Sequence, residues 1–159
     1  MIIENLQEFY QLLKARQPII SIDYGIKKMG VAISNQECTI AMPLLTIKEL
    51  KEQDKITKIL SLLATYSVCG VVIGLPISMN GQESSQTLEV QNFAKNFAKV
   101  NDLPIYLQDE RLTTMAANSL LKSFGIKRKD RNKNDDMIAA SMILETTLNS
   151  IIKLKLQTI

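Results

Sequence analysis

Three acidic side chains stand at points where a folded chain could bring carboxylates together. Asp23 ends the apolar run IISID, Glu110 closely follows the apolar run PIYLQ, and Asp136 lies near the start of a long amphipathic segment. In open α/β sheets, ligands bind beyond the carboxyl ends of the strands, where Asp23 and Glu110 would be exposed. Clusters made only of oxygen ligands suit Mg²⁺ or Mn²⁺. Two such ions about 3.5–4 Å apart can activate a water and stabilise the leaving oxygen in phosphodiester hydrolysis.

Each acid also has an ordinary structural interpretation. Asp23 precedes a Tyr-Gly pair and could bond the amides of a turn. Glu110 could be a favourable charge at the start of a helix, and Asp135 could cap the helix that Asp136 enters. Asp136 shares the inward, apolar face of that helix, where an unpaired carboxylate would be costly. Asp136 therefore needs a partner or a metal.

The sequence contains no histidine among its 159 residues. This excludes Ser-His-Asp and Cys-His triads, imidazole general bases and His-ligated zinc. Catalysis must then depend on carboxylate, lysine, hydroxyl or thiol groups, so metal-assisted hydrolysis by carboxylates fits the composition. Cys38 and Cys69 lie far apart in apolar surroundings, and we expect two buried reduced thiols rather than a disulfide.

A net charge of +3 is mild, but the positive charge is concentrated in the segment 126–134, without which the chain would be close to neutral. The bases of this segment are Lys127, Arg128, Lys129, Arg131 and Lys133. The segment directly precedes Asp136, so it could deliver a phosphate backbone to the carboxylates. A solvated surface loop is the alternative. Lys27 and Lys28 follow Asp23 and would add positive charge to the same edge.

Apolar periodicity predicts the elements that must position these residues: an N-terminal helix, three strands, a helix, a strand, a helix, a strand and two helices. The expected strands are 19–23, its hairpin partner in KKMGVAIS, 39–45, 68–76 and 104–108. The expected helices are 2–16, 47–66, 84–100, 114–124 and 135–152. An antiparallel meander followed by βα units predicts an α/β fold, with a mixed five-stranded sheet flanked by helices.

The length suits a single domain over residues 1–159, with a core over about 19–150 and an additional helix over about 2–16. That helix could pack on its own domain or contribute to a dimer, so a monomer and a homodimer both remain open. No window holds the roughly 18–20 uninterrupted apolar residues of a membrane span, and the N-terminal segment lacks a basic n-region and a small-residue cleavage site. We therefore expect no membrane partner and a cytoplasmic location.

Four blocks of the chain resemble the YqgF (RuvX) family, a branch of the ribonuclease H-like nucleases. The first matches IDYGIKKMGVAIS to the signature D-x-G-x-K-x-x-G-V-A, and the second matches VVIGLPISMNG to VVGLP-x-x-x-x-G. The third matches DERLTT to DER-[LF]-[ST]-[ST], and the fourth matches DDMIAASMILETTL to D-x-x-A-A-x-x-I-L. The blocks follow the family order and cover most of the chain.

The resemblance implies a ribonuclease H-like fold, and members are described as nucleases that mature the 5′ end of pre-16S rRNA. By this resemblance the metal-binding acids fall on Asp23, Glu110 and Asp136. Other recurrent polar positions near the site fall on Lys27, Arg111 and Thr114. The segment 126–134 corresponds to a Lys/Arg-rich segment of relatives. Asn80 stands where the family usually has an acid, which makes it a poorer candidate for an ionic role.

The sequence therefore predicts a hydrolase that cleaves phosphodiester bonds with two Mg²⁺ or Mn²⁺ ions, in 5′ processing of pre-16S rRNA during ribosome biogenesis. In this interpretation Asp23 bridges the two ions, and Glu110 and Asp136 complete one each. RNA is favoured over branched DNA as the partner, and the pre-ribosome is a further expected partner. Two alternatives stay open: a Holliday-junction-type DNA endonuclease on the same fold, and a non-catalytic RNA-binding or ribosome-assembly module.

Overall fold

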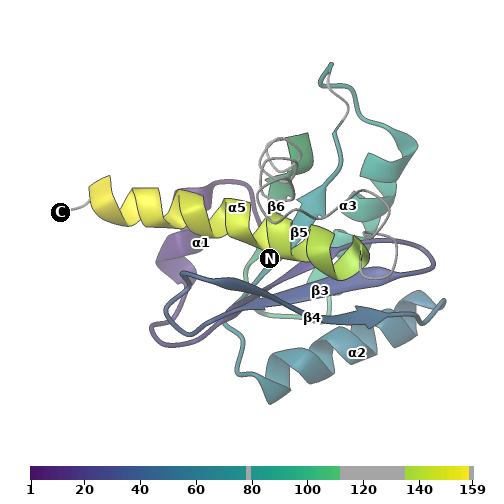
Figure 1. Ribbon diagram of the computed structural model, residues 1–159. Coiled ribbons are helices and arrows are strands. Elements are labelled where there is room, and N and C mark those ends of the chain that lie inside the picture. The colour runs from purple at the N-terminus through teal and green to yellow at the C-terminus, as the bar shows by residue number, and fades with distance from the viewer. Residues whose placement is uncertain (78–79, 112–134, 158–159) are drawn as a thin grey trace.

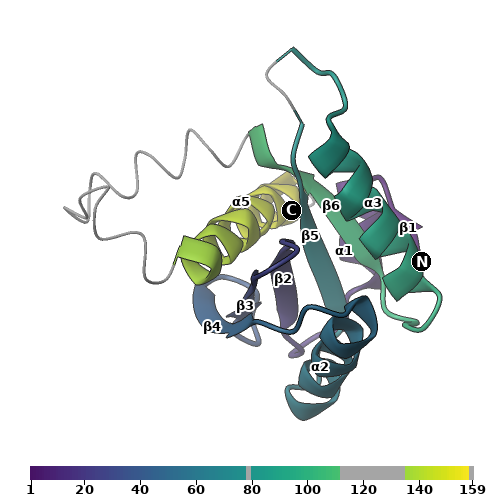
Figure 2. The same cartoon turned by 90° about the vertical axis from the view of Figure 1, so that its right-hand side faces the viewer.

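The computed structural model describes residues 1–77, 80–111 and 135–157, which form a mixed sheet between two layers of helices (Figures 1 and 2). The strands are β1 (Ile2–Ile3), β2 (Ile19–Asp23), β3 (Met29–Ser34), β4 (Ala41–Ile47), β5 (Gly70–Leu75) and β6 (Ile105–Asp109). The helices of the described residues are α1 (Leu6–Leu12), α2 (Glu52–Thr65), α3 (Ser85–Ala98) and α5 (Asp135–Gln157).

The strands lie in the order β1-β6-β5-β2-β3-β4. β2, β3 and β4 form an antiparallel meander, whereas β5 pairs in parallel with both β2 and β6. The two parallel pairs are joined by helical crossovers through α2 and α3, as βα units require. The predicted mixed α/β sheet is confirmed, and it carries a sixth, two-residue strand at the β6 edge.

The prediction of one continuous helix over 2–16 is wrong. Ile2 and Ile3 pair in parallel with β6, and the helix α1 begins only after Asn5. The Asn5 side chain caps α1 by accepting hydrogen bonds from two backbone amides, at 2.8 and 3.2 Å. Two adjacent isoleucines are too short a run to show strand alternation, and they are extended because the open edge of β6 offers them hydrogen bonds.

The remaining predicted elements that fall on described residues are present with shifted ends. The third predicted strand continues to Ile47, so α2 starts later than the predicted residue 47. Ser84 caps α3 in a capping box with Thr87. Cys38 and Cys69 are buried free thiols, as expected. The predicted helix 114–124 and the predicted loop 126–134 lie outside the described residues.

Alternation along the strands gives the sheet two apolar faces. Ile20 and Ile22 of β2 belong to the core beneath α2 and α3, whereas Ile19 belongs to the core beneath α1 and α5. Because side chains two residues apart share a face, Ser21 and Asp23 point to the α5 side. The sheet therefore presents Asp23 to α5.

α5 lies across this face of the sheet, and α2 lies on the opposite face (Figure 1). The buried inward stripe of α5 consists of Ala140, Ile143, Leu144, Leu148 and Ile151. By length and composition alone, the span Asp136–Gln157 is apolar enough to cross a membrane. Since its apolar stripe packs on the sheet, this composition is also that of a core helix.

Candidate active site

Asp23, Glu110 and Asp136 come from three elements that meet at one edge of the sheet. Asp23 ends β2, Glu110 directly follows β6, and Asp136 lies in the first turn of α5. β2 and β6 are both parallel to the strand between them, β5, so their carboxyl ends reach the same edge. All three side chains are partly buried.

Two buried hydrogen bonds dock α5 on this face. The Ser21 hydroxyl donates to the backbone carbonyl of Ala140 at 2.6 Å. The Thr147 hydroxyl donates to Gln108 Oε1 at 2.9 Å. Buried polar groups are expensive to leave unpaired, so these bonds fix both the position and the rotation of the helix. Ser21 and Gln108 each stand two residues before a strand-end acid, and the same bonds therefore place the acids relative to α5.

Two glycines leave the space that the acids and α5 occupy. Gly30 pairs with Asp23 across β2 and β3, and a Cβ added there would overlap the backbone carbonyl oxygen of Asp136. A Cβ added at Gly74 would lie 2.5 Å from Glu110 Oε1. A larger residue at either position would displace α5 or the Glu110 side chain.

The three carboxylates act on one another electrostatically. Burial, followed by the negative charges of Glu110 and Asp136, raises the pKa of Asp23 to about 7. Burial and the charge of Asp109 also raise the pKa of Glu110. Asp23 and Glu110 share a hydrogen bond, which raises the pKa of Asp23 and lowers that of Glu110. Crowded carboxylates either retain a proton in this way or bind a cation.

Arg111 is held by its neighbour Asp109. Arg111 Nη2 lies 2.7 Å from Asp109 Oδ2, and Arg111 Nε contacts both carboxylate oxygens at 3.2 and 3.1 Å. This pairing lowers the pKa of Asp109. This role of Asp109 is absent from the predicted set of site residues, although opposite charges two residues apart are a visible signal. The guanidinium is thereby oriented by one acid beside the site.

Comparison with known proteins places the chain in a family. The model of the family described as RuvX, Holliday junction resolvase, matches residues 17–150. The chain belongs to the RuvX family. Among its relatives, a candidate pre-16S rRNA nuclease of Rickettsia africae is 64% identical over 151 residues, covering 95% of this chain and 98% of the relative. The counterpart of Rickettsia felis is 64% identical over 154 residues, covering 97% and 100%.

Solved structures share the fold of this RuvX family member. RuvC of Thermus thermophilus in complex with a Holliday junction substrate superposes with a TM-score of 0.55 at 13% identity, covering 87% of this chain and 96% of RuvC. The large terminase nuclease of the thermophilic phage G20c superposes with a TM-score of 0.53 at 11% identity, covering 91% and 98%. The predicted ribonuclease H-like fold is confirmed.

The other residues that the family resemblance indicates are only partly described. Lys27 is exposed in the loop between β2 and β3, close in sequence to Asp23. Thr114 and the bases of the segment 126–134 lie outside the described residues; these bases are Lys127, Arg128, Lys129, Arg131 and Lys133.

Ser21, Gln108, Gly30 and Gly74 support the site but are absent from the set of residues that the sequence predicts. Ser21 and Gln108 carry a usable signal, because a polar residue inside an apolar strand, two positions before an acid, shares the face of that acid. Gly30 and Gly74 carry a weaker sequence signal, since Gly also occurs in strands for other reasons.

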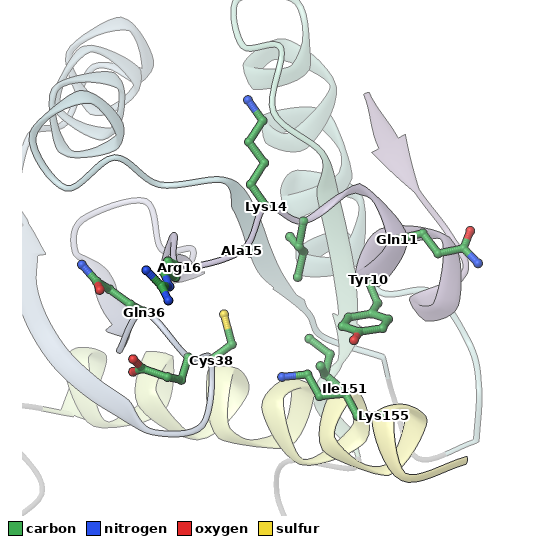
Figure 3. A pocket seen from close by; sticks show the side chains of 11 residues that line it. Tyr10, Gln11, Lys14, Ala15, Arg16, Gln36, Cys38, Ile151 and Lys155 are labelled. Atoms are coloured by element: carbon green, nitrogen blue, oxygen red, sulfur yellow. The ribbon is translucent and has the colours of Figure 1, made fainter. Parts of the chain in front are cut away.

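A cavity of about 580 Å³ lies elsewhere, between α1, the turn after β3 and the C-terminal half of α5 (Figure 3). Its lining includes Tyr10, Arg16, Cys38 and Lys155 and none of the three acids. Lys155 follows Asp136 by 19 residues along α5, which corresponds to roughly 28 Å of helix. The cavity is therefore separate from the carboxylate edge.

Proposed function

We propose that this member of the RuvX family is a nuclease that uses divalent metal ions to hydrolyse phosphodiester bonds in RNA. One observation carries the proposal: Asp23, Glu110 and Asp136 converge at one edge of a ribonuclease H-like sheet, where burial and mutual repulsion raise the pKa of Asp23 to about 7. The relatives described as pre-16S rRNA nucleases match nearly the whole chain and support the same class of reaction.

Mg²⁺ or Mn²⁺ fits the donors at this edge. The three acids offer only oxygen ligands, and the chain has no histidine that would favour a softer metal. Among residues 1–77, 80–111 and 135–157, no three acidic or thiol side chains are arranged to hold one ion together. We therefore propose that Asp23, Glu110 and Asp136 would hold the ions in pairs, Asp23 together with each of the other two acids. This assignment does not require three side chains to bind the same ion.

Such ions, when bound, supply a water of lowered pKa and stabilise charge on the phosphate. The residues of the chain would hold the ions and neutralise the charge of the bound phosphate. Asp23 must release its proton before it can act as a ligand, so protons and metal compete for the same carboxylate. Arg111, oriented by Asp109, and the exposed Lys27 are proposed to neutralise phosphate charge at this edge.

The proposed substrate is the 5′ leader of pre-16S rRNA, within a pre-ribosome in the cytoplasm. The relatives named for this substrate favour RNA. The segment 126–134, which carries five bases, is proposed to bind the phosphate backbone. A Holliday junction is the second candidate substrate, because the family description and the likeness to RuvC favour it.

A cleavage assay tests the proposal. Wild type, Asp23→Asn and the control Asp102→Asn are compared on pre-16S 5′ leader RNA, unrelated single-stranded RNA and a four-way DNA junction, with Mg²⁺, Mn²⁺ or EDTA. Asp102 is an exposed acid that precedes β6, at the strand end opposite to Glu110, so its substitution is expected to change nothing. Wild type is expected to cleave the leader only with metal, and Asp23→Asn is expected to lose cleavage while retaining its fold and RNA binding.

Full activity of Asp23→Asn would contradict the assignment of the acids. Cleavage of the junction alone would favour a resolvase. RNA binding without any metal-dependent cleavage by the wild type would favour a non-catalytic binding module.

A further inference from the structure

Lys55 of α2 is a buried lysine, with only 2% of the residue exposed. Within the described part of the chain, the ion pairs are Lys58–Glu49 and Arg111–Asp109, so Lys55 has no acidic partner there. Burying a charged group is costly unless other groups compensate for the lost water. The contacts of Lys55 therefore indicate what this charge stabilises.

All of these contacts lie in the loop between β2 and β3. Lys55 Nζ donates to the backbone carbonyl of Ile26 at 2.7 Å and to that of Gly25 at 3.3 Å. It also lies 5.1 Å from the centre of the Tyr24 ring, within cation–π range. The Tyr24 ring packs in turn against Phe93 of α3, with ring centroids 4.7 Å apart. Two helices thus hold one loop.

This loop directly follows Asp23. Its backbone turns tightly, because a Cβ added at Gly25 would overlap the carbonyl oxygen of Lys28. Asp23 points to the α5 face, whereas the next residue, Tyr24, packs against the core beneath α2 and α3. Lys55 consequently holds the loop from the side of the sheet away from the carboxylates, and leaves Lys27 exposed at the site edge.

We propose that Lys55 is a positioning residue for the carboxylate site. By holding the carbonyls of Gly25 and Ile26, it fixes the backbone that carries Asp23 and the cation Lys27. The inference rests on the proposed function and deepens it. It adds a residue from α2, a helix that contributes none of the three carboxylates of the site. Lys55 acts through the loop: its bonded partners are carbonyls and a ring, not the carboxylates.

The test is Lys55→Met, which keeps the length of the apolar stem and removes the donor. Groups that orient metal ligands are typically worth about 10–100-fold in metal affinity or activity. Lys55→Met is therefore expected to weaken Mn²⁺ binding, measured by calorimetry without RNA, by at least about tenfold. It is expected to lower kcat to a similar extent while KM for RNA stays within about threefold. Amide hydrogen exchange in residues 24–28 is expected to accelerate.

Two further variants separate positioning from general loss of charge or stability. Lys58→Met alters the same helix three residues later, where the exposed lysine pairs with Glu49 at 2.7 Å, and it is expected to leave Mn²⁺ binding unchanged. Lys55→Arg retains a cationic donor and is expected to recover part of the Mn²⁺ affinity, which a purely apolar packing role would not produce.

Mn²⁺ affinity, kcat and loop exchange of Lys55→Met within about twofold of wild type would overturn the inference. If that variant does not fold, Tyr24→Leu removes the ring contact from the loop side instead, and unchanged Mn²⁺ affinity in Tyr24→Leu overturns the inference equally. Failure of the wild type to bind Mn²⁺ would overturn the proposed function together with this inference. Normal binding by the wild type with an unaffected Lys55→Met would overturn this inference alone.

Discussion

At Asp23, burial and two neighbouring carboxylates act in the same direction on one carboxyl group. Its pKa rises from 3.8 to about 7, so near neutral pH the metal-free site holds a proton that an ordinary aspartate would have lost. The shared hydrogen bond with Glu110 stabilises that protonated form. A divalent cation would provide an alternative source of compensation for the same negative charge.

The stability of the metal-free protein is therefore expected to fall as the pH rises. Because the folded state binds the Asp23 proton more tightly than the unfolded chain, the stabilising contribution is complete below about pH 3.8 and is lost as the pH passes through about 7. Urea unfolding in EDTA at pH 5 and pH 8 measures this, with Asp23→Asn as the non-titrating control. Wild type is expected to lose more stability than Asp23→Asn over this interval, and parallel losses would contradict the prediction.

Metal is expected to reverse this trend. Mg²⁺ or Mn²⁺ binds the deprotonated carboxylates, so its addition is expected to raise the unfolding temperature more at pH 8 than at pH 5. Differential scanning calorimetry with and without the ion measures the two increments. Equal increments at both pH values, or the same increments in Asp23→Asn, would mean that the ion binds elsewhere.

At the scale of elements, α5 is placed by its contacts with the strands that carry the acids. Ser21 in β2 and Gln108 in β6 bond to points on α5 that are seven residues apart, Ala140 and Thr147. Gly30 in β3 lets the start of the helix approach the sheet closely enough to bring Asp136 to the edge. The helix therefore sits in one register on the sheet, and the distances between acids depend on this register.

Thr147→Val is expected to loosen this docking. The substitution keeps the shape of the side chain but leaves the buried Gln108 Oε1 without its hydroxyl donor, which costs about 1–3 kcal/mol. Thr146→Val is the matched control, because among the described residues the partly exposed Thr146 hydroxyl donates only to the Met142 carbonyl of its own helix, at 3.0 Å. Urea unfolding at constant pH is expected to show the loss for Thr147→Val and a change within about 0.5 kcal/mol for Thr146→Val. Equal effects would contradict the docking role.

In the whole molecule, the acids proposed for catalysis and the concentrated positive charge come from different parts of the chain. The acids depend on a sheet whose parallel strands β2, β5 and β6 end at one edge. The positive charge depends on one short stretch of sequence, since the chain without the segment 126–134 would be close to neutral. Substrate affinity and cleavage are therefore expected to respond to different substitutions.

Replacing the five bases of the segment 126–134 by Gln is expected to weaken RNA binding and reduce its salt dependence. Each lost phosphate contact reduces the slope of log K against log salt by about 0.7 for single-stranded RNA. Fluorescence anisotropy across a salt series measures the slope. The matched control replaces Lys14, Lys99 and Lys153, three exposed lysines from other parts of the chain, and is expected to change the slope less. An unchanged slope in the first variant would mean that the segment does not contact RNA.

The kinds of chemistry available and the order of the main elements could be predicted from the amino-acid sequence. The missing histidine removed whole classes of mechanism, and strand ends and helix caps are marked by neighbours a few residues away, as at Ser84. For the same reason the strand-end positions of Asp23 and Glu110 were predictable. These features depend on local spacing, which the chain states directly.

The contacts between segments distant in sequence depend on how the chain folds in three dimensions. Ile2 and Ile3 form a strand because the edge of β6 is open to them, and Lys55 is buried because a loop about 30 residues earlier offers it two carbonyls. The raised pKa of Asp23 likewise depends on its burial and on acids brought from the far half of the chain. Such properties arise from which surfaces meet, and periodicity along the chain carries no information about that meeting.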